Sequence, residues 1–212
     1  TLQQAASSKL SFGASRTMQI AQRLYQGIDI EGDTVGLITY MRTDGTNISK
    51  DAIESFRNYI SNKYGKDYLP NSPLNYSGKK AKNAQEAHEA IRPTDITRNP
   101  EVLKKHLSSD QLKLYSLIWS RALSSQMEPA KFDRKTITIS SLDEKNIFKA
   151  TGSVIKFDGY LKISNFENDN ENDTILPDVS KGNIEINEFK DEQHFTQPPP
   201  RYSEASLVKK LE

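Results

Sequence analysis

Two side chains that could act together on a phosphate stand two residues apart in the segment Gly36–Ser49, which reads GLITYMRTDGTNIS. The segment begins with apolar, strand-forming residues and becomes polar after Tyr40, so Tyr40 is predicted to stand where a strand ends in a loop. In an extended chain, its phenol and the guanidinium of Arg42 would point to the same side. The phenol oxygen could attack a phosphate while the guanidinium stabilises charge on the phosphate oxygens. On these residues alone, a solvated tyrosine and a solvated arginine are the commoner interpretation.

A second polar segment, residues 84–94, is predicted to form a short helix that ends near Pro93. His88 and Arg92 are four residues apart and would share one face of that helix, where both could contact a phosphate. The alternative is an ordinary surface histidine beside an acidic neighbour. A metal site is disfavoured because Glu86 and His88 would diverge by about 200° around the helix axis.

Basic side chains accompany both segments. Lys9 and Arg16 give the N-terminal helices a positive face, and the loop 66–82 ends in a local cluster formed by Lys79, Lys80 and Lys82. The formal net charge is only +1, so nucleic acid would have to be bound through such local patches. The alternative is a set of ordinary solvated faces.

Composition bounds the possible functions. The chain has 212 residues, 35% hydrophobic and 27% charged, which suits one large or two modest domains with a core. Cysteine is absent, which excludes a disulfide framework, thiol catalysis and a thiolate metal site. No apolar run is long enough for a transmembrane helix, no signal peptide is recognised, and no glycine-rich phosphate loop or nucleophile elbow is present. The sequence starts at Thr1 and stops at Glu212 inside a predicted helix, which predicts a fragment of a longer protein.

The predicted elements give an α+β fold in three parts. Residues 1–127 are predicted to be mostly helical, with amphipathic helices at 2–12, 16–26, 50–64, 101–107 and from Ser108 onward. Residues 128–197 alternate with period two in several stretches and contain Asp158-Gly159, a hairpin signal, so they are predicted to be antiparallel and β-rich. In residues 198–212 three prolines form a stiff hinge, and Ser203 caps a final helix.

Four stretches resemble motifs of one family, the type IA DNA topoisomerases. Gly36–Ser49 is similar to the active-tyrosine motif of that family, and Gln85–Thr94 is similar to a second motif. Thr1–Ala6 (TLQQAA) and Pro199–Val208 (PPRYSEASLV) resemble two more. The four occur in the family's order over nearly the whole chain, and bacterial members are resembled most. This outweighs the solvated interpretation of Tyr40.

The resemblance implies a DNA-cleaving role. In the family a tyrosine attacks a backbone phosphate of one DNA strand, forming a 5′-phosphotyrosine link and freeing a 3′-hydroxyl. Another strand passes, and the break is resealed, which relaxes negative supercoils without ATP. Tyr40 is thereby implied to be the nucleophile, Arg42 to stabilise the charged transition state, and His88 to contact phosphate or position the nucleotide. The remaining candidates for DNA contact are Thr39, Asp44, Arg92, Arg201, Ser203, Lys9, Arg16, Lys79, Lys80 and Lys82.

The resemblance also implies a setting for the chain. Residues 1–127 would be the tyrosine-bearing domain, 128–197 a segment of a β-rich arch, and 198–212 the hinge and first helix of the next domain. The family's Mg²⁺ is held by an acidic N-terminal domain that nothing in this sequence matches, so no metal site and no relaxation activity are expected of this chain alone. Single-stranded DNA is the implied partner, and the protein is implied to be a cytoplasmic, nucleoid-associated monomer.

One position departs from the family pattern. Gly45 stands where bacterial relatives usually carry serine, which removes a hydroxyl and predicts a looser loop. The alternative function is a non-catalytic, single-stranded nucleic-acid-binding module on the same scaffold, and a weaker alternative is a structural or interaction fragment.

Overall fold

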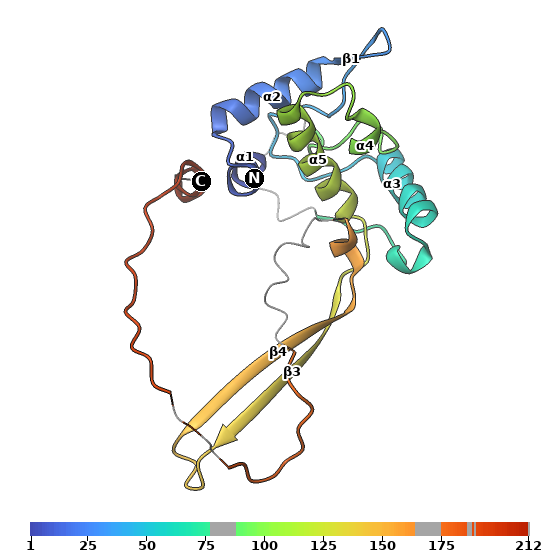
Figure 1. Ribbon diagram of the computed structural model, residues 1–212. Helices are drawn as coiled ribbons and strands as arrows, with labels where there is room; N and C mark the ends of the chain where they lie inside the picture. Colours follow the sequence, from blue (N-terminus) through green and yellow to red (C-terminus); the bar gives the residue numbers. More distant parts are fainter. Residues whose placement is uncertain (77–87, 164–174, 186–187, 189, 212) are drawn as a thin grey trace, which may run out of the picture.

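A computed structural model describes residues 1–76, 88–163, 175–185, 188 and 190–211. Helices gather at one end of the molecule, and one long β-hairpin projects from them (Figure 1). This combination of helices with small antiparallel sheets confirms the predicted α+β fold. No helix within the described ranges has the length and apolarity needed to span a bilayer.

Between Leu2 and Ser124 the described residues form five helices, a 3₁₀ turn and a small hairpin. In chain order these are α1 (Leu2–Leu10), α2 (Ala14–Gln26), β1 (Ile28–Ile30), β2 (Asp33–Val35), α3 (Lys50–Lys63), η1 (Lys66–Tyr68), α4 (Pro100–Leu103) and α5 (Ser109–Ser124). Strands β1 and β2 pair antiparallel.

Local sequence signals set the ends of the main helices. The Ser49 side chain accepts a hydrogen bond from the backbone N–H of Ala52 (3.4 Å) and begins α3. Ser108 and Gln111 cap each other's backbone N–H groups and begin α5. Gly27, at a φ of 127° that favours glycine, ends α2. These caps explain why the predicted helices form where they do.

The core is built around α5. Two of its buried side chains also donate hydrogen bonds: Tyr115 Oη to the carbonyl of Arg98 (2.7 Å) and Trp119 Nε1 to the carbonyl of Ile96 (3.0 Å). Burial raises the pKa of Tyr115, which keeps its hydroxyl a donor. The buried apolar side chains of the surrounding helices are Ile20, Ala21 and Leu24 of α2 with Ala52, Phe56 and Ile60 of α3.

The hairpin consists of β3 (Lys131–Ser140) and β4 (Ile147–Phe157), which pair antiparallel from Phe132↔Ile155 to Ser140↔Ile147. The predicted alternation thus forms strands here, whereas the described residues 175–185, 188 and 190–197 contain none. The hairpin turn predicted at Asp158-Gly159 is wrong. A 3₁₀ turn, η2 (Gly159–Lys162), follows instead, because Gly159 packs against the backbone of residues 128–130 just before β3, where a Cβ would lie 2.5 Å from the carbonyl oxygen of Glu128.

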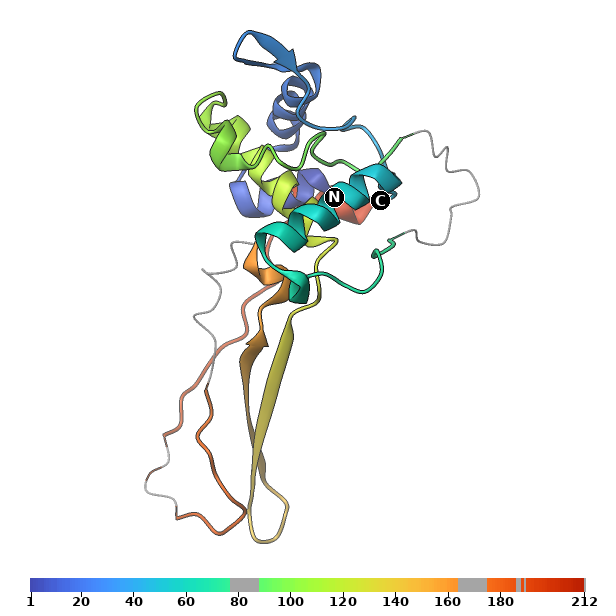
Figure 2. The ribbon, with the colours of Figure 1, turned by 90° about the vertical axis from the view of Figure 1, so that its right-hand side faces the viewer.

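After the hairpin the chain returns to the helical end. The described residues 175–203 contain no regular structure and lead to α6 (Glu204–Leu211), which lies beside α1 (Figures 1 and 2). The N-cap of α2, Gly13, has no side chain to cap the helix, and the Glu204 carboxylate accepts a hydrogen bond from the backbone N–H of Ala14 (3.1 Å) instead. A residue 190 positions away along the chain therefore satisfies one free N–H group of α2.

Candidate active site

The segment that carries Tyr40 is held by pairing with a distant part of the chain. Strand β2 ends at Val35, and the residues that follow form an isolated antiparallel bridge between Ile38 and Pro93. On each side of that bridge a backbone hydrogen bond, of 2.9 and 3.0 Å, joins residues 37–39 to residues 92–94. Tyr40 therefore follows a short ladder to residues 92–94 rather than the regular strand that was predicted.

Buried residues on both sides of Tyr40 fix it to the core. Leu37 and Ile38 are each 1% exposed, and Met41 is 3% exposed. The backbone N–H of Leu37 also donates to the carbonyl of Leu24 in α2 (2.8 Å). The backbone at Tyr40 is thus anchored before and after the residue.

The Tyr40 ring lies between two other rings. The Tyr25 ring meets it edge-on at a centroid distance of 5.4 Å, and the His88 ring lies at 4.9 Å, tilted by 48°. The ring is half-buried, and its hydroxyl makes no hydrogen bond within the described part of the chain. Aromatic contacts therefore restrict the ring while the oxygen stays available to a substrate.

Arg42 is exposed and makes no ion pair with any described residue. Residues 41 and 42 form a bend, so the predicted geometry of an extended chain does not hold at this point. Asp44 is also exposed, two residues further on. A guanidinium and a phenol, neither with a polar partner among the described residues, thus stand two residues apart at a fixed site.

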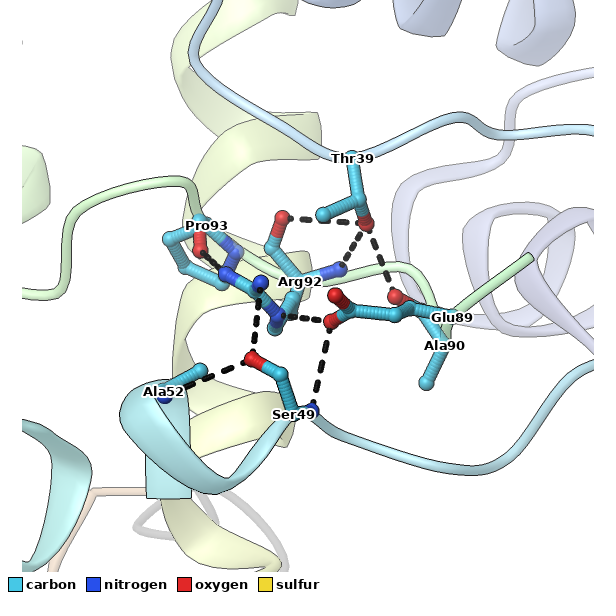
Figure 3. Close-up of polar contacts among 7 residues, drawn as sticks. All are labelled: Thr39, Ser49, Ala52, Glu89, Ala90, Arg92 and Pro93. Atoms are coloured by element: carbon cyan, nitrogen blue, oxygen red, sulfur yellow. Dashed lines mark hydrogen bonds and ion pairs between the residues drawn. The ribbon is translucent and has the colours of Figure 1, made fainter. Parts of the chain in front are cut away.

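A polar cluster centred on Arg92 lies beneath the loop (Figure 3). Arg92 Nε donates to the Glu89 carboxylate at 2.7 Å, Nη2 donates to Ser49 Oγ at 3.4 Å, and Nη1 donates to the Pro93 carbonyl at 3.0 Å. Only 12% of the Arg92 side chain is exposed. The hydrogen bond from Arg92 lowers the pKa of Glu89, so this carboxylate is ionised at neutral pH.

The cluster joins three segments. Glu89 also accepts from the backbone N–H of Ser49 (3.4 Å), the residue that caps α3. Thr39 Oγ1 donates to the carbonyl of Ala90 (2.8 Å) and accepts from the backbone N–H of Arg92 (3.0 Å). The polar groups of Thr39 and Arg92 are thus used to hold the Tyr40 loop, the start of α3 and residues 89–93 together.

The helix predicted for residues 84–94 is wrong in its described part, because residues 88–93 form no helix. Their backbone groups bond to the Tyr40 segment instead; the N–H of Ala90, for example, donates to the carbonyl of Asn47 (2.8 Å). His88 and Arg92 therefore do not share a helix face. His88 is exposed and packs on Tyr40, whereas Arg92 lies in the cluster with Glu89.

Gly45 allows the loop to approach residue 88 closely. A Cβ on Gly45 would lie 2.3 Å from the carbonyl oxygen of His88 and 3.0 Å from Thr43 Oγ1. The backbone N–H of Gly45 also donates a hydrogen bond to Thr43 Oγ1 (2.9 Å), which supports the loop locally. The glycine therefore allows close contact between the loop and residue 88, and the looser loop that Gly45 suggests stays a prediction.

The other predicted DNA contacts are scattered. Arg16 pairs with Asp110 and lies over the Phe12 ring at 5.1 Å. Lys9 lies exposed in the last turn of α1, and Arg201 is exposed before α6. Ser203 accepts from the backbone N–H of Ser206 (3.2 Å) and caps α6, as predicted. Lys79, Lys80 and Lys82 lie outside the described residues.

The described side chains offer no magnesium site. Mg²⁺ binds oxygen ligands, usually carboxylates. The described ranges contain no group of three or more His, Cys, Asp or Glu side chains placed to hold a metal ion. The described part of the chain therefore does not fit Mg²⁺.

Sequence reasoning missed Tyr25 and Glu89 as parts of the site. Glu89 could have been recognised as a partner of Arg92 from their three-residue spacing, although that spacing suggests a helix that does not form. Tyr25 lies 15 residues before Tyr40, at the end of α2, and no local pattern links the two rings.

Comparison with known proteins supports one family. The profile of the DNA topoisomerase family matches residues 1–212. The DNA topoisomerase 1 of Rickettsia felis is 51% identical over 216 residues, and that of Campylobacter jejuni is 47% identical over 213 residues; each match covers 100% of this chain. The full-length topoisomerase I of Thermotoga maritima matches 99% of the chain in structure, with a TM-score of 0.74 and 38% sequence identity.

The chain spans only part of these relatives. It corresponds to 28% of the Rickettsia protein, 30% of the Campylobacter protein and 33% of the Thermotoga chain. The match nevertheless covers every motif on which the resemblance was based. The resemblance is therefore confirmed, and the chain belongs to the DNA topoisomerase family, with bacterial type I enzymes as its relatives.

Proposed function

We propose that this chain is the tyrosine-bearing part of a type IA topoisomerase and that Tyr40 cuts one DNA strand. The phenol oxygen attacks a backbone phosphate, and the bond between phosphorus and the 3′ oxygen breaks. A 5′-phosphotyrosine link and a 3′-hydroxyl result. The phenol proton passes to a base, and the departing oxygen takes up a proton. Passage of another strand, followed by the reverse reaction, would relax negative supercoils.

The observation that carries this proposal is the state of Tyr40. Its ring is restricted by Tyr25 and His88, and its hydroxyl has no hydrogen-bond partner in the described ranges. A nucleophile needs this combination of a fixed position and an unused reactive atom.

The neighbouring residues take distinct roles in the proposal. The guanidinium of Arg42, which has no ion pair among the described residues, would stabilise charge that develops on the phosphate oxygens. His88, packed against the phenol ring, would contact the same phosphate. Thr39 and Arg92 would act by positioning the loop, because their polar groups are engaged with Ala90 and Glu89.

The proposed partner is single-stranded DNA, bound by a monomer in the bacterial cytoplasm at the nucleoid. Residues 1–127, 128–197 and 198–212 are proposed as the tyrosine-bearing domain, the arch segment and the start of the next domain. The proposed phosphate contacts come from four basic side chains, Lys9, Arg16, Arg42 and Arg201. Such contacts would release counterions, so DNA binding should weaken steeply as salt rises. The Mg²⁺ of the intact enzyme is proposed to be held elsewhere in the protein.

Covalent capture of DNA tests the nucleophile. The protein at its natural length is mixed with Mg²⁺ and a single strand labelled at its 3′ end, because the 5′-phosphotyrosine retains that end. Tyr40→Phe should form no labelled adduct, whereas the matched control Tyr25→Phe should form one, since both variants lose only a hydroxyl. An adduct with Tyr40→Phe would refute the assignment. DNA binding without any adduct by the unchanged protein would favour the non-catalytic module.

A further inference from the structure

A hollow of about 790 Å³ adjoins the end of the Tyr40 loop. Its boundaries are one face of α3, the segment 69–76 and residues 46–48. Its size lies within the range of pockets that hold small molecules and far exceeds what an inorganic ion needs. The side chains that matter for its chemistry are Ile53, Arg57, Asn58, Leu74, Tyr76 and Gln126.

Arg57 brings a positive charge to this hollow. It lies four residues after Ile53 and therefore on the same face of α3. Its Nη2 donates to the carbonyl of Pro70 (2.8 Å), but its Nη1 is buried without any hydrogen-bond partner. No carboxylate of the described chain pairs with it. A buried guanidinium N–H without an acceptor is uncommon in folded proteins. Arg57 also lines the hollow, so its guanidinium gives an entering anion further N–H donors.

The wall opposite α3 is fixed by hydrogen bonds. The Gln126 amide donates to the carbonyl of Leu74 (2.9 Å) and accepts from its N–H (3.2 Å). Tyr76 Oη donates to the carbonyl of Ser125 (2.9 Å), and the Tyr76 carbonyl accepts from Thr46 Oγ1 (3.2 Å). The segment 74–76 is thereby tied both to the end of α5 and to the Tyr40 loop, so the hollow is a built feature.

Charge and shape together indicate the class of ligand. Two basic side chains, Lys50 and Arg57, and one acidic side chain, Glu54, line the hollow, which favours an anion. Leu74 and Ile53 supply apolar surface. Tyr76 is 53% exposed, and the hydrogen bond from its hydroxyl to Ser125 holds its ring in place. An exposed, fixed aromatic ring is a stacking surface for a nucleobase.

We propose that this hollow binds a nucleoside phosphate, with the phosphate on Arg57 and the base on Tyr76. The ligand is either a free nucleotide or one nucleotide of a DNA strand. The second source rests on the proposed function, whereas the binding chemistry itself does not. The site is separate from the group around Tyr40 and adjoins it through Thr46–Ile48.

Calorimetric titration of the protein at its natural length tests the proposal with thymidine 5′-monophosphate as the probe. Arg57→Gln should weaken binding at least about tenfold, the usual loss for a charge-assisted hydrogen bond. Arg134→Gln, which changes an exposed arginine of β3, should leave binding unchanged. Thymidine without phosphate should bind at least about tenfold more weakly than the monophosphate. Circular dichroism checks that each variant is folded.

A second variant guards against misfolding of Arg57→Gln. Asn58→Glu alters an exposed residue of the lining and adds a negative charge. This variant should weaken binding of the monophosphate but not binding of thymidine. Equal binding by the unchanged protein, Arg57→Gln and Asn58→Glu, or equal affinity for thymidine and its monophosphate, would overturn the proposal.

The source of the phosphate is tested by competition. The ligand is a DNA strand if an oligothymidylate displaces the monophosphate and if Arg57→Gln weakens binding of that oligothymidylate. The ligand is a free nucleotide if the oligothymidylate does not displace the monophosphate. Tyr40→Phe should bind the monophosphate normally, so failure of the cleavage proposal and failure of this one give different results.

Discussion

Removing the charge of Glu89 should destabilise the protein measurably. Glu89→Gln keeps the shape of the side chain but leaves the guanidinium of Arg92, only 12% exposed, without its counter-ion. Breaking a fully buried pair costs about 3–5 kcal/mol. Because 38% of the Glu89 side chain is exposed, solvent offsets part of this loss, and we expect about 2 kcal/mol. For a chain of 212 residues this corresponds to a fall of about 4–8 °C in Tm.

The pH dependence of this loss identifies its cause. The pKa of Glu89 is lowered from its ordinary value of 4.5 by the hydrogen bond from Arg92. A carboxylate with a lowered pKa in the folded state contributes stability above its unfolded pKa and loses it as pH falls through the folded pKa. The difference between the unchanged protein and Glu89→Gln should therefore be full at neutral pH and shrink below pH 4.5. Urea unfolding of both proteins at several pH values measures it.

The matched control is Glu31→Gln. Glu31 pairs with Lys105, and both side chains are largely exposed, at 76% and 69%. Screening by solvent makes such pairs nearly neutral for stability, so this variant should unfold at the same urea concentration as the unchanged protein. Equal effects of Glu89→Gln and Glu31→Gln at neutral pH, or a difference for Glu89→Gln that does not shrink in acid, would refute the reasoning.

Three further predictions concern the loop and the isolated chain. Arg42→Lys should retain measurable cleavage of a single strand and Arg42→Ala should lose much more, because lysine keeps the charge without the forked geometry; equal cleavage by the two would exclude a role for the charge. Gly45→Ala should lower the free energy of unfolding by about 1–3 kcal/mol in urea titration, because its Cβ would lie 2.3 Å from the carbonyl oxygen of His88, whereas Gly182→Ala, with nothing within 4 Å, should be neutral. The 212-residue chain alone, mixed with supercoiled plasmid and Mg²⁺, should leave the topoisomers unchanged, and relaxation by it would show that the chemistry is self-contained.

Local signals were enough to predict most helices. Ser49 and Ser108 are side-chain caps within three residues of their partners, and Gly27 ends α2 through its own backbone angle. The helix predicted from Ser108 onward likewise forms as α5, in which Trp119 is 6% exposed. Each of these features depends on residues that lie within one or two helical turns of each other, so the sequence pattern shows it directly.

Long-range pairing was beyond the reach of such signals. The sequence around His88 favours a helix locally, but the backbone of residues 90–94 bonds to residues 37–39 and 47, more than 40 positions earlier in the chain. Tertiary context therefore overrides local propensity in the segment that holds the candidate nucleophile. The unpaired nitrogen of Arg57 and the contact of Glu204 with α2 are likewise products of three-dimensional packing.

The contact between Glu204 and α2 has a mechanical consequence. The chain leaves the helical end through the hairpin and comes back to it at α6, so the two ends of this path meet without a covalent bond. The hydrogen bond from the backbone N–H of Ala14 to Glu204 is one of the contacts where they meet. A bond of this kind contributes about 1 kcal/mol, so thermal motion can break it often. The return segment remains a tether after the break and keeps α6 at a high effective concentration near α1, so reclosure is intramolecular and independent of protein concentration. The contact between α6 and the N-terminal helices can therefore break and re-form repeatedly without the two parts diffusing apart.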